Sequence, residues 1–412
     1  MCKRIVGIIS FMNAAGAQEA LLRLMRQLRA RGYETEVWFL YEQVPCYRDE
    51  AGVRVLLPKR KLSPFEYVTV SLQLFSRLRR EKPDAVIGFL PLGNVLGLSA
   101  AAAAGIDLRI ASQRSPGPTF GRAMRMLDRM LGTFGVYQAI VCVSQSVRDS
   151  FAGYPATYRS KMRVVNNGIE WCPATLGKAD ARASFGLPPD LPLFAATGRF
   201  NPQKNYSLMV RAVAATKGIR LAIAGDGLLR AEAEELARTL GAADRIHFLG
   251  NISHSRVCDL LRASDGFIQT SLYEGQSNST LEAMHEGLPI ICSDIVMQRE
   301  TVCEDGAEPA ALLVPLADFT AWIGALEQLR DDRAFADLLG RRAKALVEKR
   351  FTLQRMIDGF EQVLIDQETL HGTQGGQAAP DSTSALYDEL RGASRLIDGA
   401  RSDYTAGRTP QP

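Results

Sequence analysis

Residues 270–289 read Thr-Ser-Leu-Tyr-Glu-Gly-Gln-Ser-Asn-Ser-Thr-Leu-Glu-Ala-Met-His-Glu-Gly-Leu-Pro, and an apolar run, Gly266 to Thr270, leads into them. This run predicts a buried strand, and the loop after it holds an acid, Glu274, and a glycine. Residues 277–280 are rich in helix N-caps and open a helical run to about Glu286. In α/β proteins, ligands bind where a strand ends in a polar loop and a helix begins. The free N–H groups at that helix start attract phosphate.

Two acids, Glu274 and Glu282, lie eight positions apart in this stretch. An anionic ligand held between carboxylates should carry hydroxyl groups, because hydroxyls donate to carboxylates, and a nucleotide sugar has both features. The alternative is structural: Ser279 and Glu282 have the spacing of a capping box, in which Glu282 only closes the helix start. On spacing alone we prefer the capping box for Glu282. Glu274, a loop acid beside a glycine, has no obvious structural role.

Composition predicts a two-domain protein of ordinary globular type. The chain has 412 residues, of which 46% are hydrophobic and 23% charged. No apolar run approaches the roughly 20 residues of a membrane span, and we interpret the N-terminus as a buried strand rather than a signal peptide. The seven cysteines form no CxxC pair, and the four histidines show no metal-site spacing. We therefore expect a cytoplasmic protein with reduced cysteines and no metal.

Charge is distributed unevenly along the chain. Residues 1–170 hold 24 Lys+Arg against 13 Asp+Glu, a net charge of +11, whereas the remainder holds 25 against 32, a net charge of −7. A basic first half suggests an anionic partner, either a membrane surface or lipid phosphate, or a nucleic acid. Basic and aromatic residues are not interleaved along the predicted strands, so we do not expect nucleic-acid binding.

Strand and helix patterns alternate through both halves of the chain. The strands are predicted at 3–10, 36–41, 53–57, 85–90, 108–112, 139–144 and 162–165, and then at 193–197, 220–224, 246–249, 266–270, 289–293 and 311–314. Helical stretches lie between the strands of the first half and, in the second half, are predicted near 205–215, 229–240, 253–263, 280–286 and 318–329. This alternation predicts two α/β domains with mostly parallel sheets. The predicted organisation is a first domain (1–170), a linker (171–192), a second domain (193–350), a helix (351–370) and a mostly disordered tail (371–412) with one short helix at 384–397.

Two basic stretches in the first half are of interest. Lys59-Arg60-Lys61 precedes an apolar helical run that ends in three arginines, and residues 120–134 form a helical pattern with Arg122, Arg125 and Arg129 off the apolar stripe. Such helices bind anionic membranes. The commoner explanation, which we place slightly ahead, is a core-facing helix with solvated arginines.

Further polar loops follow predicted strands. Residues 198–206 carry Arg199 and Lys204, two cations that would neutralise a pyrophosphate if they are not merely solvated. Gly225-Asp226-Gly227 and Leu249-Gly250-Asn251 end the next two strands and are weaker signals. Gly16 opens the first helix, either as a turn glycine or to let the backbone approach a phosphate. The fingerprint G-x-G-x-x-G is absent there, which argues against a dehydrogenase.

These residues resemble glycosyltransferase family 4. Residues 274–282 match its E-x7-E signature, and the resemblance runs from about residue 3 to 370. Its other landmarks, in chain order, are Ala15-Gly16-Ala17 (with the first glycine of the usual Gly-Gly-Ala lost), Asn167-Gly168-Ile169, Gly198-Arg199-Phe200 with Lys204, Gly225-Asp226-Gly227 and Phe248-Leu249-Gly250. The resemblance implies a GT-B fold: two Rossmann-like domains facing a cleft, with a C-terminal helix crossing back to the first domain.

The resemblance also implies a function. The protein is expected to move a hexose or N-acetylhexosamine from a nucleoside-diphosphate sugar, UDP-linked by preference, to a glycan or lipid-linked acceptor, with retention and without metal or cofactor. Its expected donor-binding residues are Gly16, Arg199, Lys204, Gly225, Asn251, Asn278, Ser279, Thr280 and Glu282, with Glu274, Arg199 and Lys204 as the catalytic group. Arg199 and Lys204 would hold the diphosphate, Glu282 the ribose and Glu274 the donor sugar.

The sequence departs from the family pattern at two places. Gln276 stands where an aromatic or small apolar residue is frequent, and Ser112 to Pro116 lack the histidine that many relatives carry after the fifth strand. Arg114 is therefore expected to meet an acidic acceptor such as a lipid diphosphate, with Arg122 and Arg125 on the same acceptor side. The rival functions are a GT-B sugar-nucleotide epimerase and a non-enzymatic protein that binds nucleotide sugars or nucleic acid. The protein would rest on the inner face of the membrane as a peripheral protein.

Overall fold

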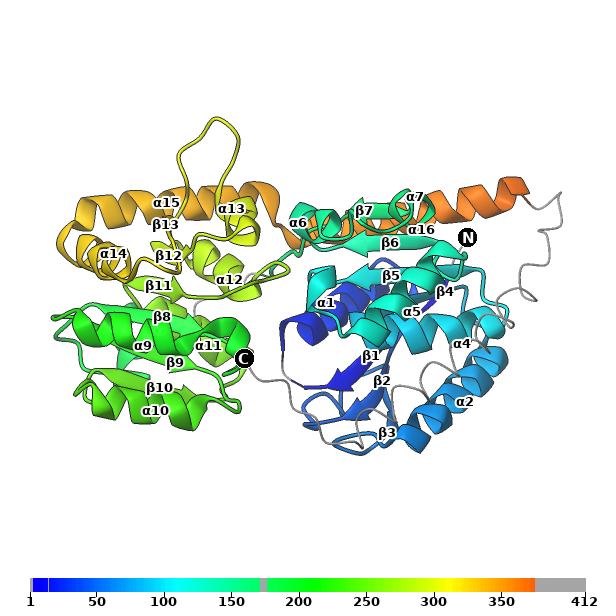
Figure 1. Ribbon diagram of the computed structural model, residues 1–412, viewed down its shortest axis with the longest axis horizontal. Coiled ribbons are helices and arrows are strands. Elements are labelled where there is room, and N and C mark those ends of the chain that lie inside the picture. The colour runs from blue at the N-terminus through cyan, green and yellow to red at the C-terminus, as the bar shows by residue number, and fades with distance from the viewer. Residues whose placement is uncertain (1–2, 14, 171–175, 375–412) are drawn as a thin grey trace, which may run out of the picture.

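The computed structural model describes residues 3–13, 15–170 and 176–374, which form two α/β domains side by side (Figure 1). Each domain is built on one parallel sheet with helices on both faces. The strands are nearly continuous apolar runs because both faces of each sheet are covered. The predicted fold class, GT-B, is confirmed.

The first domain has a seven-stranded parallel sheet in the order β3-β2-β1-β4-β5-β6-β7. Its strands are β1 (Arg4–Met12), β2 (Glu34–Glu42), β3 (Val53–Leu57), β4 (Ala85–Phe89), β5 (Leu108–Gln113), β6 (Ala139–Cys142) and β7 (Met162–Val164). Its helical segments are α1 (Gly16–Ala30), α2 (Pro64–Glu81), α3 (Leu90–Leu92), the π-helix η1 (Gly93–Gly97), α4 (Leu98–Ala103), the 3-10 turn η2 (Gly117–Thr119), α5 (Arg122–Thr133), α6 (Gln145–Asp149) and α7 (Ala156–Arg159). One apolar core joins the sheet to α2, α4 and α5, and another joins it to α1.

The second domain has a six-stranded parallel sheet in the order β10-β9-β8-β11-β12-β13. Its strands are β8 (Leu193–Thr197), β9 (Arg220–Ala224), β10 (Ile246–Gly250), β11 (Gly266–Gln269), β12 (Ile290–Ser293) and β13 (Leu312–Val314). Its helical segments are α8 (Lys178–Ser184), the 3-10 turn η3 (Pro202–Lys204), α9 (Tyr206–Ala215), α10 (Arg230–Thr239), α11 (His254–Ala263), α12 (Asn278–Glu286), α13 (Val296–Val302), α14 (Phe319–Asp331) and α15 (Arg333–Arg350).

In both sheets the strand order reverses beside the first strand. β1 pairs with β2 on one side and β4 on the other, and β8 pairs with β9 on one side and β11 on the other. Ligands of open α/β sheets bind at the carboxyl ends of the strands at such a reversal. The reversal in the second sheet is flanked by the loops that carry Arg199 and Glu274, so the topology places the predicted residues at one edge.

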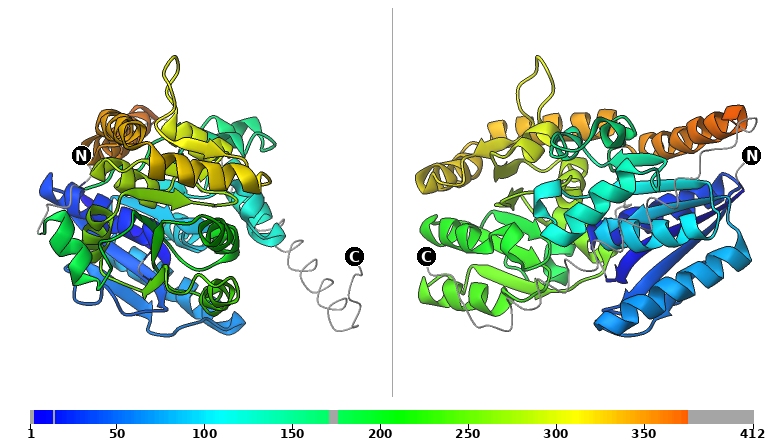
Figure 2. Two further views of the ribbon diagram at one scale, coloured as in Figure 1. Left: turned by 90° about the vertical axis from the view of Figure 1, so that its left-hand side faces the viewer. Right: turned by 45° about the vertical axis from the view of Figure 1, so that its right-hand side comes forward.

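The last helix, α16 (Leu353–Gln374), returns to the first domain, as predicted. Met356, Phe360 and Leu364 are buried in the core that contains α1 and β1. Thr352 pairs with Ile169 in an isolated bridge just before this helix begins. Figure 2 shows α15 and α16 following one another along one side of the molecule, from the second domain to the first. Within the described part of the chain, no helix combines the length and apolar composition needed to cross a membrane.

Three features differ from the sequence prediction. The segment predicted as linker contains α8, whose Ala181 is buried in the core of the second domain, together with Leu187 just after it. The Pro and Gly residues around this short helix concealed its apolar face. The helix α13 was not predicted at all. Residues 371–374 continue α16, whereas 171–175 and 375–412, including the helix predicted at 384–397, lie outside the described residues.

Candidate functional site

The two domains meet where two helices begin. α1 begins at Gly16 after β1, and α12 begins at Asn278 after β11. The Asn278 side-chain amide donates to the Gly16 carbonyl at 3.1 Å, and a Cβ on Gly16 would lie 3.1 Å from that amide nitrogen. Asn167, at the end of the first domain, donates to the Asn278 side chain at 2.8 Å. The structure thus brings Gly16 and Asn278 together, and glycine leaves room for their close approach.

The first turn of α12 has N–H groups to offer to an anion. Ser277 is the N-cap, and its hydroxyl accepts from the Thr280 amide at 3.3 Å. Among the described residues, the Asn278 and Ser279 amides have no such partner. The Thr280 amide is therefore occupied and its side chain buried, so the free donors of this turn belong to Asn278 and Ser279.

Glu282 is not the capping-box residue that its spacing suggested. The helix begins two residues earlier than a Ser279 cap requires, with Ser277 as its N-cap, and this places Glu282 in the second turn. Its carboxylate is largely buried and lies 3.8 Å from the imidazole Nδ1 of His254 at the start of α11. Burial raises the pKa of Glu282, and nearby His254 opposes that shift. Since the helix start does not use this carboxylate, it remains free to accept hydroxyl donors.

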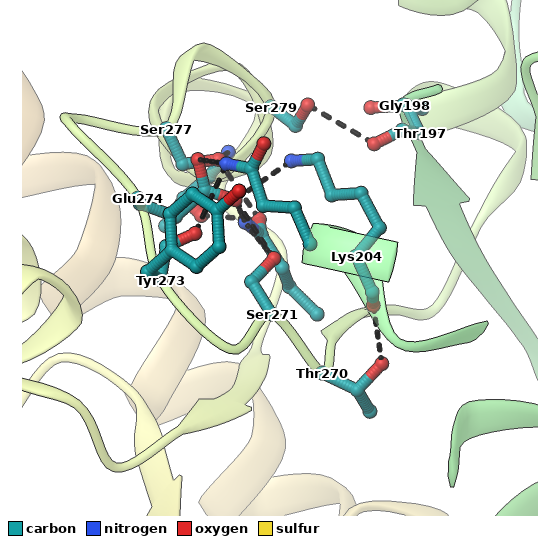
Figure 3. Close-up of polar contacts among 12 residues, drawn as sticks. Thr197, Gly198, Lys204, Thr270, Ser271, Tyr273, Glu274, Ser277 and Ser279 are labelled. Carbon is teal, nitrogen blue, oxygen red and sulfur yellow. Dashed lines mark hydrogen bonds and ion pairs between the residues drawn. The ribbon is translucent and has the colours of Figure 1, made fainter. Parts of the chain in front are cut away.

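Glu274 is held by a dense set of donors (Figure 3). Its Oε1 accepts from Lys204 Nζ at 2.8 Å, Gln269 Nε2 at 2.8 Å and Ser271 Oγ at 2.7 Å. Its Oε2 accepts only from Gln203 Nε2, at 3.2 Å, within the part of the chain that the structure describes. The residue is buried, with 6% of its surface exposed. The two residues that the sequence singled out, Lys204 and Glu274, therefore form an ion pair, and Oε2 is the carboxylate oxygen with acceptor capacity to spare.

Gln269, at the end of β11, was not identified from the sequence. Its amide group donates to Glu274 and to Ser271, while its carbonyl oxygen accepts from the hydroxyls of Ser277 at 2.9 Å and Thr280 at 2.7 Å. One buried side chain thus joins the loop acid to the start of α12. The only signal in the sequence was a glutamine in an otherwise apolar strand, which is costly to bury without partners.

Arg199 lies in the loop after β8 and differs from Lys204 in having no partner. Its side chain is exposed and makes no ion pair or hydrogen bond with another described residue. The loop is shaped by close glycine contacts: Gly198 and Gly225 both have positive φ, and a Cβ on Gly225 would lie 2.0 Å from the Gly198 carbonyl oxygen. A side chain at position 225 would therefore collide with the backbone of Gly198, which is a structural reason for glycine there. Asn251 is exposed just after β10, and its role stays a prediction.

The loop that carries Glu274 is docked on the first domain. Ser144 Oγ donates to the Gly275 carbonyl at 2.9 Å, and the Asn167 amide donates to Gln276 Oε1 at 2.6 Å. A Cβ on Gly275 would lie 2.0 Å from the Arg114 carbonyl oxygen, so glycine is needed for this approach. Gln276, which departs from the family pattern, is therefore engaged in a contact between the domains.

The three arginines expected on the acceptor side occupy different environments. Arg114 follows β5 and is buried; its guanidinium donates to the Asn167 side chain and lies 5.1 Å from the ring centroid of Phe89. Burial lowers its pKa to about 9, and it has no carboxylate partner among the described residues. Arg122 is exposed and Arg125 half-buried on α5, which packs on η1 and α7. The structure brings Arg114 to the loop of Glu274 but gives no contact of Arg122 or Arg125 with it.

Two family models match the chain. Glycosyltransferase Family 4 matches residues 14–170, and Glycosyl transferases group 1 matches residues 177–346. The chain is a GT-B glycosyltransferase of the family 4 type. The matches cover both domains, including Gly16, Arg199, Glu274 and Glu282.

Proteins similar to this glycosyltransferase include two bacterial enzymes. The lipopolysaccharide core biosynthesis glycosyltransferase LpsE of Rhizobium meliloti is 25% identical over 358 residues, which cover 86% of this chain and 97% of LpsE. The UDP-Gal:alpha-D-GlcNAc-diphosphoundecaprenol alpha-1,3-galactosyltransferase of Escherichia coli is 24% identical over 78% of this chain and 85% of its own length. The structure of Anabaena HepE in complex with UDP and glucose has a TM-score of 0.77, 16% identity, and coverage of 88% of this chain and 100% of HepE.

Proposed function

We propose that this glycosyltransferase moves a hexose or N-acetylhexosamine from a UDP-linked donor to a glycan or lipid-linked acceptor, with retention of the anomeric configuration. The product would belong to a surface polysaccharide, lipopolysaccharide or glycolipid. The names of the relatives support this class: one acts in lipopolysaccharide core biosynthesis, and another is named for a UDP-galactose donor and a diphosphoundecaprenol acceptor. The observation that carries the proposal is Arg199, a cation without a hydrogen-bond or ion-pair partner among the described residues, in the loop after Thr197, whose carbonyl accepts from the Ser279 hydroxyl at the start of α12 at 3.1 Å.

In the proposed reaction the nucleoside diphosphate leaves, and negative charge grows on its bridging oxygen. Arg199 offers its free guanidinium to that charge. Lys204 has three N–H donors, of which Glu274 uses one, so two remain for phosphate oxygens. The amides of Asn278 and Ser279 add the positive end of α12. Lys204, held by Glu274, and the amides of α12 are fixed before the donor binds, and preorganised charge is the largest contribution to many such reactions.

The same arrangement supports metal-independent transfer. Fixed cations and amides supply the stabilisation that a divalent ion would give a diphosphate leaving group. The described residues include no group of three His, Cys, Asp or Glu side chains placed to hold a metal ion. We propose that the transfer requires no metal ion, and activity in the presence of EDTA measures this directly.

The two acids have separate proposed roles. Glu274 Oε2, which accepts one weak hydrogen bond, would receive a hydroxyl of the donor sugar. Glu282 would accept from the ribose hydroxyls. Arg114, a buried cation without a carboxylate partner beside the Glu274 loop, would attract the phosphate of a lipid-linked acceptor. The protein would then act at the cytoplasmic membrane surface as a peripheral protein.

The test is a transfer assay with the purified full-length protein. UDP- and GDP-sugars are supplied with sugar-diphosphate-lipid acceptors in the presence of EDTA, and products are identified by mass spectrometry and NMR. The proposal expects a UDP-sugar to be consumed only with an acceptor and the new bond to keep the donor's anomeric configuration. Epimerisation of a sugar nucleotide without acceptor, an inverted product, or no turnover of any nucleotide sugar would contradict it.

A further inference from the structure

Helix α2 is apolar on two opposite sides. One side, Val70, Leu74 and Leu78, is fully buried against the first sheet. The other side is exposed: Phe65 has 86%, Val68 59% and Leu72 63% of its surface in contact with solvent. The exposed residues follow the spacing i, i+3 and i+7, so they share one face of the helix.

This exposed face is presented rigidly. The Ser63 amide donates to the Glu66 carboxylate at 2.8 Å, which fixes the start of α2 and therefore the position of Phe65 in its first turn. The apolar side of a helix is normally buried, and a cluster of large exposed apolar side chains marks an interaction surface. No described residue covers these three side chains.

The surroundings of the face are basic. Arg60 and Lys61, just before the helix, are exposed and have no carboxylate partner among the described residues. The nearby acids are already neutralised: Glu66 pairs with Lys59, and Glu81 pairs with Arg4 and Arg54. At the far end of the helix, Arg79 falls on the exposed side as well, beside Phe75. Apolar residues surrounded by unpaired cations are complementary to an anionic lipid surface.

The location of the face suits an enzyme with a lipid-linked acceptor. α2 follows β3, so its first turn lies at the carboxyl edge of the first sheet. Gly16 follows β1 and Arg114 follows β5 at that same edge, because all strands of the sheet are parallel. α2 runs along the outside of the first domain (Figures 1 and 2). A bilayer against its first half would lie at the edge that carries the acceptor-side residues.

The other basic helix, α5, is less suited to this contact. Its exposed large apolar residues are Met126 at 42% and, just past its end, Phe134 at 53%, which lie eight positions apart. The guanidinium of Arg129 lies 5.8 Å from the ring centroid of Tyr154, so part of the basic face is turned to the protein. Both helices have similar patterns of basic and apolar residues in the sequence, and only their exposed side chains in the structure distinguish them.

We propose that the α2 face, defined as Arg60, Lys61, Phe65, Val68 and Leu72, binds an anionic lipid bilayer. This inference rests on the membrane association proposed above and assigns it to α2 in place of α5. The apolar residues enter the headgroup region, and the two cations interact with lipid phosphates. Both contributions are needed, since one weak anchor gives only marginal membrane binding.

The test is sedimentation of the full-length protein with vesicles of phosphatidylcholine containing or lacking phosphatidylglycerol, without any substrate. Binding should require the anionic lipid. A Phe65→Ser/Val68→Ser/Leu72→Ser variant should bind at least about tenfold more weakly, and Arg60→Gln/Lys61→Gln should weaken binding and reduce its salt dependence. The control Arg122→Gln/Arg125→Gln/Arg129→Gln should bind nearly as the wild type does. Unchanged binding of the α2 variants, or loss only in the α5 variant, would overturn the proposal.

Two further measurements separate this inference from its rivals. Light scattering should find the wild type monomeric, and photo-crosslinking from position 68 should not reach residues 375–412. A wild-type dimer that dissociates in the Phe65→Ser/Val68→Ser/Leu72→Ser variant would assign the face to a second copy. A crosslink to residues 375–412 would assign it to the chain's own C-terminal segment. Transfer to a short-chain acceptor in detergent should be equal in wild type and α2 variant, so loss of lipid binding is distinguished from failure of the proposed reaction.

Discussion

Lys204 Nζ lies 2.8 Å from Glu274 Oε1, so the cation expected to hold the donor diphosphate and the acid expected to meet the donor sugar are directly paired. Both side chains are largely buried, with 14% and 8% exposed. The pair fixes the position of two groups that would act on neighbouring parts of one ligand. It also means that a change in either residue alters the other.

Glu274→Gln should separate catalysis from nucleotide binding. The variant keeps the shape of the side chain but removes the charge that would attract a sugar hydroxyl, so we expect transfer to fall at least about a hundredfold. Lys204 loses a competing carboxylate and becomes freer for phosphate, so UDP should bind about fivefold more tightly. Steady-state kinetics and calorimetry measure the two effects, and wild-type turnover in this variant would exclude the proposed role.

Removing one partner of the pair should destabilise the second domain more than removing both. Lys204→Met leaves the Glu274 carboxylate buried without its cation, at a cost of about 3 kcal/mol. The Lys204→Met/Glu274→Gln double variant removes the charge as well and should recover most of that loss. Denaturant unfolding of the two single variants and the double variant tests this, and strictly additive changes would show that the ion pair contributes nothing.

Gln269 should act as a positioning residue for both halves of the donor site. Gln269→Glu still accepts from Ser277 and Thr280 but no longer donates to Glu274, so turnover should fall while UDP affinity is kept. Gln269→Leu removes both the donor to Glu274 and the acceptor for Ser277 and Thr280. It should therefore weaken UDP binding as well, because the start of α12 loses its acceptor. Measuring kcat and UDP affinity in each variant checks this division. Equal effects of the two substitutions on both quantities would indicate a purely structural glutamine.

Asp128 on α5 should make the first domain less stable as pH rises. Its carboxylate is fully buried, where Gln113 and Tyr158 donate to it at 2.8 Å, and burial raises its pKa to about 6. A folded-state pKa above the unfolded value near 4 means that the protonated form favours folding below about pH 4. This stabilisation is about 3 kcal/mol at low pH, and it is lost as the pH rises through 6.

The matched variant for this effect is Asp128→Asn, which cannot ionise. Its Tm relative to wild type should rise between pH 4.5 and pH 8, because only the wild type must bury a charge at the higher pH. Differential scanning calorimetry at the two values measures that difference. A difference in Tm that is the same at both pH values would show that Asp128 does not titrate in this range.

Much of the fold followed from local pattern. The strands are apolar runs with polar loops at their carboxyl ends, and a parallel sheet brings those loops to one edge. This is why Arg199 and Glu274 could be assigned to one region before any contact was known, whereas Gly16, in the other domain, was placed beside them only by the family resemblance. α8 and α13 were missed because each is only seven residues long, too short for helical periodicity to be evident.

Other features of the site depend on contacts between distant residues. The capping-box interpretation of Glu282 failed because the hydroxyl of Ser277, rather than that of Ser279, caps the helix. Gln269 was missed because its partners come from a loop and a helix start further along the chain. The difference between α2 and α5 lies in which apolar side is covered, and that depends on how each helix packs on the sheet.

The most direct test of the account is calorimetric binding of UDP to the wild type and to Arg199→Gln, with GDP and ADP for comparison. The Arg199 side chain makes no hydrogen bond or ion pair with another described residue, so its substitution should leave the fold intact and report on the ligand alone. The account predicts that UDP binds the wild type and that Arg199→Gln weakens binding at least about tenfold. Failure of the folded wild type to bind any nucleoside diphosphate, or equal affinity in the variant, would contradict it.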